Sequence, residues 1–286
     1  LTDSSGGSFK IDSTTGVVTT DAVLDYETLS SHTITVEALS TDGSKNSSDF
    51  TINVTDVNEP ITAVSDANVS SDTVPENSLG DTLVGVTASA TDEDSGDTVS
   101  YSLTDSSSGS FKIDSTTGVV TTDAVLDYET LSSHTITVEA LSTDGSKNSS
   151  DFTINVTDVN EPITAVSDAN VSSDTVPENS SGNTLVGVTA SATDEDSGDT
   201  VSYSLTDDAG GRFKINETTG ELSVTDSSDL DFEDKNSHTV TVKATSTDGT
   251  SNTKDFTINV SDVNEPITVV SDTNVSSDTV PENSFG

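Results

Sequence analysis

Internal repetition constrains this chain more than any other feature. Residues 1–78 recur as residues 103–180 with a single difference, Gly6 against Ser108. A third, more divergent copy follows at the same spacing, with Phe213 in the place of Phe111. Each repeat is about 100 residues long, which is the size of a small domain. The sequence therefore predicts consecutive domains with separate cores rather than one large core.

Within each repeat, apolar and polar residues alternate along short segments separated by Asp, Ser and Gly clusters. Ile136, Val138 and Ala140 share one side of the segment 134–140, as in a β-strand with one buried face. Further strands are expected at 82–90, 98–103, 111–114, 118–122 and 151–156, with an extended segment around Val74. The pattern predicts an all-β chain of tandem, seven-stranded immunoglobulin-like β-sandwiches.

Composition limits both the core and the partners. With 29% hydrophobic residues and no Trp, Met or Cys, each core must be small, and neither disulfides nor thiolate metal sites can brace it. The 51 acidic residues exceed the 9 basic ones, and the net charge of −42 repels nucleic acid and anionic membranes. This composition also fits a disordered acidic chain, but the regular alternation argues against disorder.

The acidic residues are grouped at fixed places in each repeat. In the second repeat they form Pro75-Glu76-Asn77, Asp92-Glu93-Asp94, Asp127 with Glu129, and Asp158 with Asn160 and Glu161. Carboxylate and carbonyl oxygens are hard ligands suited to calcium, and converging carboxylates repel one another unless a cation lies between them. An EF-hand beginning at Asp92 is excluded, because its twelfth position is Leu103 rather than Glu.

This ordered set of motifs resembles that of cadherin repeats along the whole chain. The family carries a Pro-Glu-Asn-type Glu, an Asp-x-Asp, a Leu-Asp-Arg-Glu-type pair and an acidic linker, all of which converge on calcium ions between successive domains. The resemblance implies a linear array of cadherin-type sandwiches: a partial repeat at 1–59, complete repeats at 60–161 and 162–265, and an N-terminal strand at 266–286. We interpret the chain as a window within a longer repetitive fibre.

Carried over residue by residue, the resemblance implies calcium ligands at three junctions. The first junction would use Asp25, Glu27, Asp56, Asn58, Glu59, Asp92 and Asp94. The second would use Glu76, Asp127, Glu129, Asp158, Asn160, Glu161, Asp194 and Asp196, and the third starts from Glu178, Asp231, Glu233, Asp262, Asn264 and Glu265. Asp144 and Asp248 are displaced from the family's Ala-x-Asp-x-Gly pattern, so two ions per junction are favoured over three.

Other chemistry finds little support in the sequence. His32, His134 and His238 occupy one repeat-equivalent position with no second His or Cys nearby, which favours a structural role over a transition-metal site. Neither a strand-turn-helix nucleophile motif nor a glycine-rich phosphate loop is present, so we expect no enzyme. The acidic pairs could serve glycoside hydrolysis, but their recurrence at every junction suits a scaffold better.

Near-identical repeats suit a spacer whose length depends on the number of domains. Repeat segments such as AVSD, YSLTD, TTGVVT, SHTITVEA and TDGS resemble those of giant secreted bacterial adhesins of the RTX-adhesin type, which implies a location on the bacterial cell surface. We therefore expect a calcium-stiffened adhesion stalk. Its partners would be calcium ions, the neighbouring repeats and other cell-surface molecules that bind further domains. Direct homophilic adhesion, or glycan binding by the repeats themselves, is the alternative.

Overall fold

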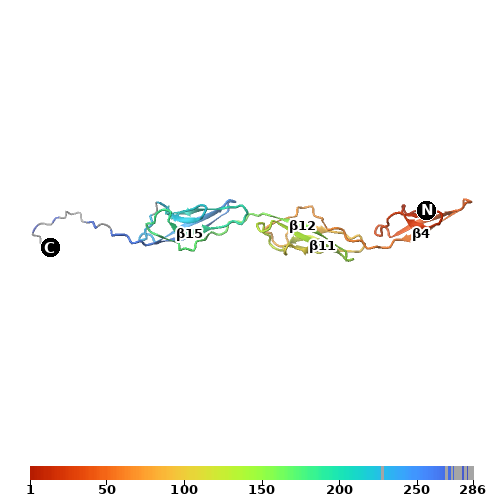
Figure 1. Cartoon of the computed structure of the whole chain (residues 1–286), viewed down its shortest axis with the longest axis horizontal. Helices are drawn as coiled ribbons and strands as arrows, with labels where there is room; N and C mark the ends of the chain where they lie inside the picture. Colours follow the sequence, from red (N-terminus) through yellow and green to blue (C-terminus); the bar gives the residue numbers. More distant parts are fainter. Residues whose placement is uncertain (227–228, 268–269, 272, 274–278, 280–281, 283–286) are drawn as a thin grey trace. The chain divides into compact units, whose positions relative to one another are not determined.

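The structure is a computed structural model that describes residues 1–226, 229–267, 270, 271, 273, 279 and 282. Every regular element among these residues is a β-strand, which confirms the all-β prediction (Figure 1). The chain divides into two compact units, Leu1–Val159 and Asn160–Gly286, each of which is described by itself. The strand predicted within 266–286 falls largely outside the described residues.

The first unit contains the partial repeat and one complete β-sandwich. In the partial repeat, β1 (Phe9–Ile11) pairs with β2 (Val18–Thr20), and β3 (Ser31–Leu39) pairs with β4 (Lys45–Asn53). One sheet of the sandwich has the order β5 (Ser65–Asp66), β7 (Leu83–Ser89), β10 (Val119–Thr122), β9 (Phe111–Ile113). The other has the order β6 (Thr73–Pro75), β12 (Lys147–Thr157), β11 (Ser133–Ser142), β8 (Val99–Asp105). The long strands β11 and β12 lie side by side in Figure 1.

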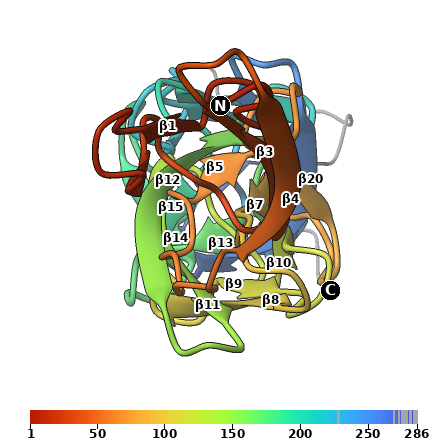
Figure 2. The same cartoon turned by 90° about the vertical axis from the view of Figure 1, so that its right-hand side faces the viewer.

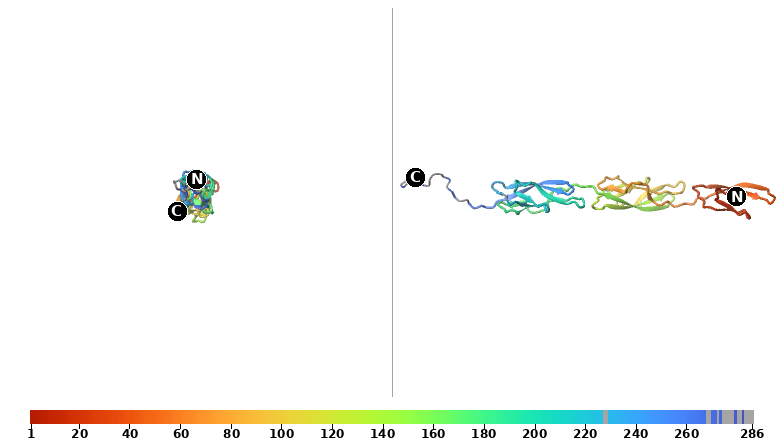
Figure 3. Two further views of the ribbon diagram at one scale, coloured as in Figure 1. Left: turned by 90° about the vertical axis from the view of Figure 1, so that its left-hand side faces the viewer. Right: turned by 90° about the horizontal axis from the view of Figure 1, so that it is seen from above.

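The second unit repeats this sandwich strand for strand. Its first sheet has the order β13 (Ser167–Asp168), β15 (Leu185–Ser191), β18 (Glu221–Val224), β17 (Phe213–Ile215). Its second sheet has the order β14 (Thr175–Pro177), β20 (Ser251–Ser261), β19 (Ser237–Ser246), β16 (Val201–Asp207). Figures 2 and 3 give further views of the same strands.

Each complete sandwich has its own core of small aliphatic residues. In the first unit, Ile136, Val138 and Ala140 are fully buried, as the alternation along β11 predicts. Ile154 and Val156 of β12 are buried as well, whereas Phe152 is only partly buried. Because the core is filled by alternate residues of both sheets, the loops at the strand ends are free to carry polar groups.

The extended segment around Val74 takes part in both sheets, which the sequence did not indicate. β5 pairs antiparallel with β7, and β6 then pairs parallel with β12. The crossing loop lies so close to β7 that a Cβ on Gly85, at φ +93°, would be 2.3 Å from the Ser71 carbonyl oxygen. The expected single strand is therefore two short pieces, and the second piece ends immediately before Glu76.

The one residue that differs between the first two repeats lies in a strained turn. Ser107, Ser108 and Gly109 have φ values of 51°, 59° and 88°, and Gly6 takes the place of Ser108 in the first repeat. A non-glycine residue in this left-handed region costs about 1 kcal/mol. We expect Ser108→Gly to raise the free energy of unfolding by about that amount in urea denaturation, and Gly6→Ser to lower it. A lower stability of Ser108→Gly would contradict the strain.

The histidines are packed side chains of the sandwich. His134 is 8% exposed, its Nδ1 lies 2.9 Å from the Ser107 hydroxyl oxygen, and its ring meets Phe111 edge-on at 5.3 Å. His32 makes the equivalent contacts with Ser5 and Phe9. These contacts support the structural role that the sequence favours.

Burial lowers the pKa of His134 below that of the unfolded chain. Between the two pKa values the unfolded chain binds a proton that the folded chain does not, so stability falls as the pH falls below about 6.5. We expect the contribution of His134 to the free energy of unfolding, taken as the difference between the unaltered chain and His134→Gln, to be lower at pH 5.5 than at pH 7.5 by roughly a few tenths of a kcal/mol after allowance for solvent screening. His134→Gln should lose this part of the pH dependence, and an unchanged profile would contradict it.

Candidate metal centres

Four carboxylates gather at one place in the first unit. Glu27, Asp56, Glu59 and Asp94 each offer an oxygen, and the four oxygens lie within 4.8 Å of one another. Glu27 precedes β3, Asp56 and Glu59 follow β4, and Asp94 follows β7. The sequence predicts all four as ligands of the first junction, and the structure brings them together.

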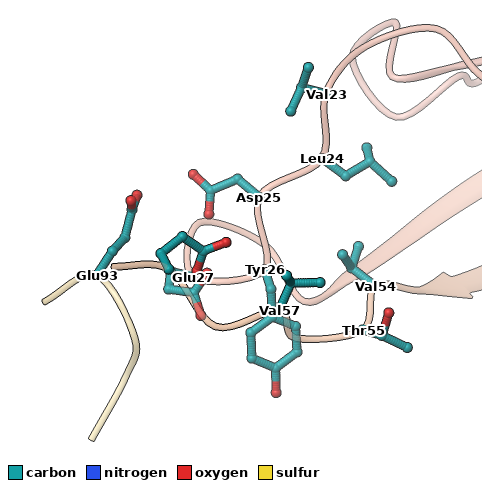
Figure 4. Close-up of a pocket in the computed structure, with 10 residues that line it drawn as sticks. Val23, Leu24, Asp25, Tyr26, Glu27, Val54, Thr55, Val57 and Glu93 are labelled. Atoms are coloured by element: carbon teal, nitrogen blue, oxygen red, sulfur yellow. The ribbon is translucent and has the colours of Figure 1, made fainter. Parts of the chain in front are cut away.

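A shallow pocket opens beside this cluster. Its lining includes Asp25, Glu27, Glu59 and Glu93 together with the apolar residues Val23, Leu24, Val54 and Val57. Figure 4 shows the carboxylates of Asp25, Glu27 and Glu93 on one side of the view and Val54 and Val57 on the other. Leu24 and Val54 correspond to Leu126 and Val156, which are buried in the complete repeat, so this apolar lining belongs to the core of the repeat.

A second cluster shares Asp94 with the first. Asp92, Asp94 and Asp144 offer oxygens within 4.8 Å of one another. The linker is bonded to the same residues: Asn58 Nδ2 donates to Asp144 Oδ2 at 2.7 Å, and the Glu59 backbone N–H donates to Asp94 Oδ2 at 3.0 Å. The sequence analysis ranks Asp144 lower because it is displaced from the family's Ala-x-Asp-x-Gly pattern, whereas the structure places it beside Asp92 and Asp94.

The electrostatics of the four-carboxylate cluster favour a cation between the carboxylate oxygens. Burial raises the pKa of Glu27 and of Glu59, and the charges of neighbouring acids raise both further. Burial likewise raises the pKa of Asp94, with the charge of Asp56 adding to it. Glu27 Oε1 and Glu59 Oε2 are buried with no hydrogen-bond partner among the described residues. Buried unpaired oxygens are costly, and a cation between them would remove that cost.

The second unit contains the counterpart of the Asp92–Asp94–Asp144 cluster. Asp194, Asp196 and Asp248 offer oxygens within 4.8 Å of one another. Asn160 Nδ2 donates to Asp248 Oδ2 at 2.9 Å, and the Glu161 N–H donates to Asp196 Oδ2 at 3.0 Å. Asp194 Oδ2 is buried with no hydrogen-bond partner among the residues with described positions.

Two further clusters form at the opposite ends of the complete sandwiches. Glu76, Glu129 and Asp158 converge within 4.8 Å in the first unit, and Glu178, Glu233 and Asp262 do so in the second. In each cluster the first Glu follows the short strand β6 or β14, and the last Asp follows β12 or β20. All six residues are predicted ligands, of the second and third junctions respectively.

Other predicted ligands make local contacts instead. Both carboxylate oxygens of Asp25 accept hydrogen bonds from Thr28, and those of Asp127 do so from Thr130. These side-chain and backbone hydrogen bonds lower the pKa of each Asp. Asp231 accepts the Asp234 N–H at 3.1 Å, Asn264 Nδ2 donates to the Glu265 carbonyl at 3.3 Å, and Glu265 Oε1 accepts Asn179 Nδ2 at 2.8 Å. The acidic clusters found among the described residues contain none of these five predicted ligands, which are Asp25, Asp127, Asp231, Asn264 and Glu265.

Tandem two-sheet sandwiches whose carboxylates gather at the strand ends define a modular, all-β repeat protein. The cadherin domain model matches residues 1–55, 71–157 and 173–261, more than half of the chain. The chain therefore belongs to the cadherin family, whose domains are extracellular. Among the described residues, no helix is long and apolar enough to cross a membrane.

Relatives and solved structures agree with this assignment. Human Protocadherin Fat 4 is 37% identical over 159 residues, covering 52% of this chain and 3% of that protein. Human Cadherin EGF LAG seven-pass G-type receptor 1 is 32% identical over 252 residues, covering 84% of this chain and 8% of that protein. The crystal structure of mouse Cadherin-23 EC22-24 matches with a TM-score of 0.64 and 26% identity, covering 90% of this chain and 83% of that one. The chain thus spans only a small part of the two curated relatives.

Proposed function

We propose that this chain is the calcium-binding repeat region of a long extracellular adhesin, in which Ca²⁺ stiffens the junctions between repeats and makes the array an extended stalk. The observation that carries the proposal is the convergence of Glu27, Asp56, Glu59 and Asp94. These carboxylates come from one repeat, from the linker and from the next repeat. An ion held by all of them would join the partial repeat to the linker and the next repeat, in addition to the hydrogen bonds from the linker to Asp94 and Asp144.

The donor set fits calcium better than other metals. Every acidic cluster among the described residues consists of carboxylates, the chain has no Cys, and no His belongs to a cluster. Such hard oxygen ligands suit the six- to eight-fold coordination of Ca²⁺, whereas Mg²⁺ keeps more of its water. Bound calcium would supply the positive charge that lets the buried carboxylates stay ionised together. The buried, unpartnered oxygens of Glu27, Glu59 and Asp194 support this.

We propose the members of the acidic clusters as the main calcium ligands. Asp144 and Asp248 are among them, because they lie beside the Asp-x-Asp pairs. For the second junction we propose Glu76, Glu129 and Asp158 as ligands within the first unit, and Asn160, Asp194 and Asp196 as ligands within the second. Asp25, Asp127 and Asp231 remain proposed ligands that would exchange their local hydrogen bonds for the metal.

The stalk role is favoured by repetition and by charge. The first two repeats are almost identical, so no single repeat needs a binding surface of its own. A net charge of −42 makes like repeats repel unless calcium neutralises it, which favours a spacer over direct homophilic adhesion. The amino-acid sequence of the repeats supports a bacterial surface adhesin. The two curated relatives reported above are human proteins, and they support membership of the cadherin family alone.

Small-angle scattering of the full chain tests this function. We expect the chain to be flexible in chelator and to become rod-like as Ca²⁺ is added, because each ion joins segments across a junction. An equal concentration of Mg²⁺ serves as the control and should have a smaller effect. Scattering curves that are identical with Ca²⁺ and with chelator would rule out the proposed function.

A further inference from the structure

The buried Glu of the Pro-Glu-Asn motif makes contacts that need no ion. Glu76 is 4% exposed, its Oε2 accepts the Tyr128 backbone N–H at 2.7 Å, and its Oε1 accepts the Val159 N–H at 2.9 Å. Tyr128 lies between Asp127 and Glu129, and Val159 follows Asp158. One side chain thus joins the turn and the linker that carry the other two acids of its cluster.

The same arrangement occurs independently in the second unit. Glu178 is 3% exposed, its Oε2 accepts the Phe232 N–H at 2.8 Å, and its Oε1 accepts the Val263 N–H at 2.7 Å. Phe232 replaces Tyr128 in a repeat that has diverged elsewhere. The contacts are therefore tied to the backbone and not to the identity of the residues that donate.

Short strands place each Glu where it can reach both segments. Pro75 at the end of β6 lies opposite Thr157 of β12, and the Glu76 N–H then donates to the Thr157 carbonyl at 3.0 Å. The next residue, Asn77, turns into the left-handed region at φ +56°, and its N–H donates to the Leu126 carbonyl at 3.0 Å. The backbone on both sides of Glu76 is thus fixed by hydrogen bonds, which restricts where the carboxylate can point.

We propose that Glu76 and Glu178 are positioning residues that assemble their metal centres before any ion binds. An ionised carboxylate that accepts two backbone N–H groups forms charge-assisted hydrogen bonds, and burial strengthens them. Each Glu holds the acidic turn and the linker together, so that Glu129 and Asp158, or Glu233 and Asp262, converge in the ion-free chain. This lowers the cost of ordering the ligands when the ion arrives. Only this last step rests on the proposed calcium function.

Amide hydrogen exchange of the full chain in chelator tests the positioning directly. Glu76→Gln keeps the size of the side chain but replaces one accepting oxygen with an NH₂ group, so one of the two N–H groups loses its partner. We expect exchange at Tyr128 or Val159 to become about tenfold faster or more, while the core amides of Val138 and Ile154 stay protected. Glu178→Gln should do the same at Phe232 or Val263.

Asp158→Asn is the matched control, because it removes one carboxylate from the same cluster and leaves both Glu76 hydrogen bonds in place. It should leave the exchange of both amides unchanged in chelator. Full protection of Tyr128 and Val159 in Glu76→Gln would overturn the proposal. Faster exchange throughout the sandwich would also overturn it, because that result indicates a general structural role.

Calcium titration separates this inference from the proposed function. Both variants remove one negative charge from the cluster, but Glu76→Gln also releases the turn and the linker. We therefore expect Glu76→Gln to lose about tenfold more calcium affinity than Asp158→Asn. Equal losses would overturn the positioning role and leave calcium binding intact. If the unaltered chain bound no calcium, the proposed function would fall, whereas the exchange result in chelator would still stand.

Discussion

Replacing Asp94 with Asn is expected to lower the calcium affinity of the first junction by about 100-fold. Asp94 belongs to both the Glu27–Asp56–Glu59 cluster and the Asp92–Asp144 cluster, so one substitution removes a charge from two groups of ligands. Losing one attractive unit charge at contact distance near a protein surface costs several kcal/mol before compensation by water, and a 100-fold change corresponds to about 2.7 kcal/mol. Isothermal titration of the full chain with Ca²⁺ measures the loss.

Glu93→Gln provides the control for Asp94→Asn. Glu93 is the exposed neighbour of Asp94 and lies outside the acidic clusters of the described residues. The substitution Glu93→Gln therefore removes one negative charge, as Asp94→Asn does, without removing a member of a cluster. It should reduce affinity by less than about threefold, because the Glu93 charge acts on the nearby carboxylates from outside the cluster. Equal effects of the two substitutions would show that the junction responds to net charge and not to ligand geometry.

Sequence alone predicted the elements whose signal is local. The alternation along 134–140 identified a strand with Ile136 and Val138 inside, and both are fully buried. The split of the first strand between two sheets was not predictable, because it depends on the close approach of the Ser71 carbonyl to Gly85. That contact joins residues that are separate in sequence and leaves no periodic pattern.

The candidate sites show the same division between local and tertiary information. The motifs placed Glu27, Asp56 and Glu59 in one cluster, and the structure brings them together. Motif order could not reveal that Asp144 reaches Asp92, because the two residues are far apart in sequence. The hydrogen bonds from Thr130 to Asp127 are local, but the family resemblance assigns Asp127 to the metal and so does not point to them. Ligand geometry therefore has to come from the fold, even where ligand identity can be read from the motif.

Acidification should weaken calcium binding at the first junction at a pH above the usual pKa of a carboxyl group. Burial and neighbouring charges raise the pKa values of Glu27, Glu59 and Asp94, so protons compete with the metal at a higher pH than they would at exposed acids. We expect the apparent affinity to fall by about tenfold or more between pH 7.5 and pH 5.5. The same titration repeated across this range in a non-chelating buffer measures it.

In the ion-free chain, acidification should instead increase the contribution of Glu27, Glu59 and Asp94 to the stability of the fold. Because the raised pKa values mean that the folded state binds protons more tightly than the unfolded state, their contribution to stability increases as the pH falls through the folded values. Calcium should therefore stabilise the first junction strongly at pH 7.5 and weakly at pH 5.5, where protons already relieve part of the repulsion. In Asp94→Asn the pH dependence of affinity should be shallower. An affinity for calcium that is the same at both pH values would contradict the raised pKa values and the buried carboxylate cluster that causes them.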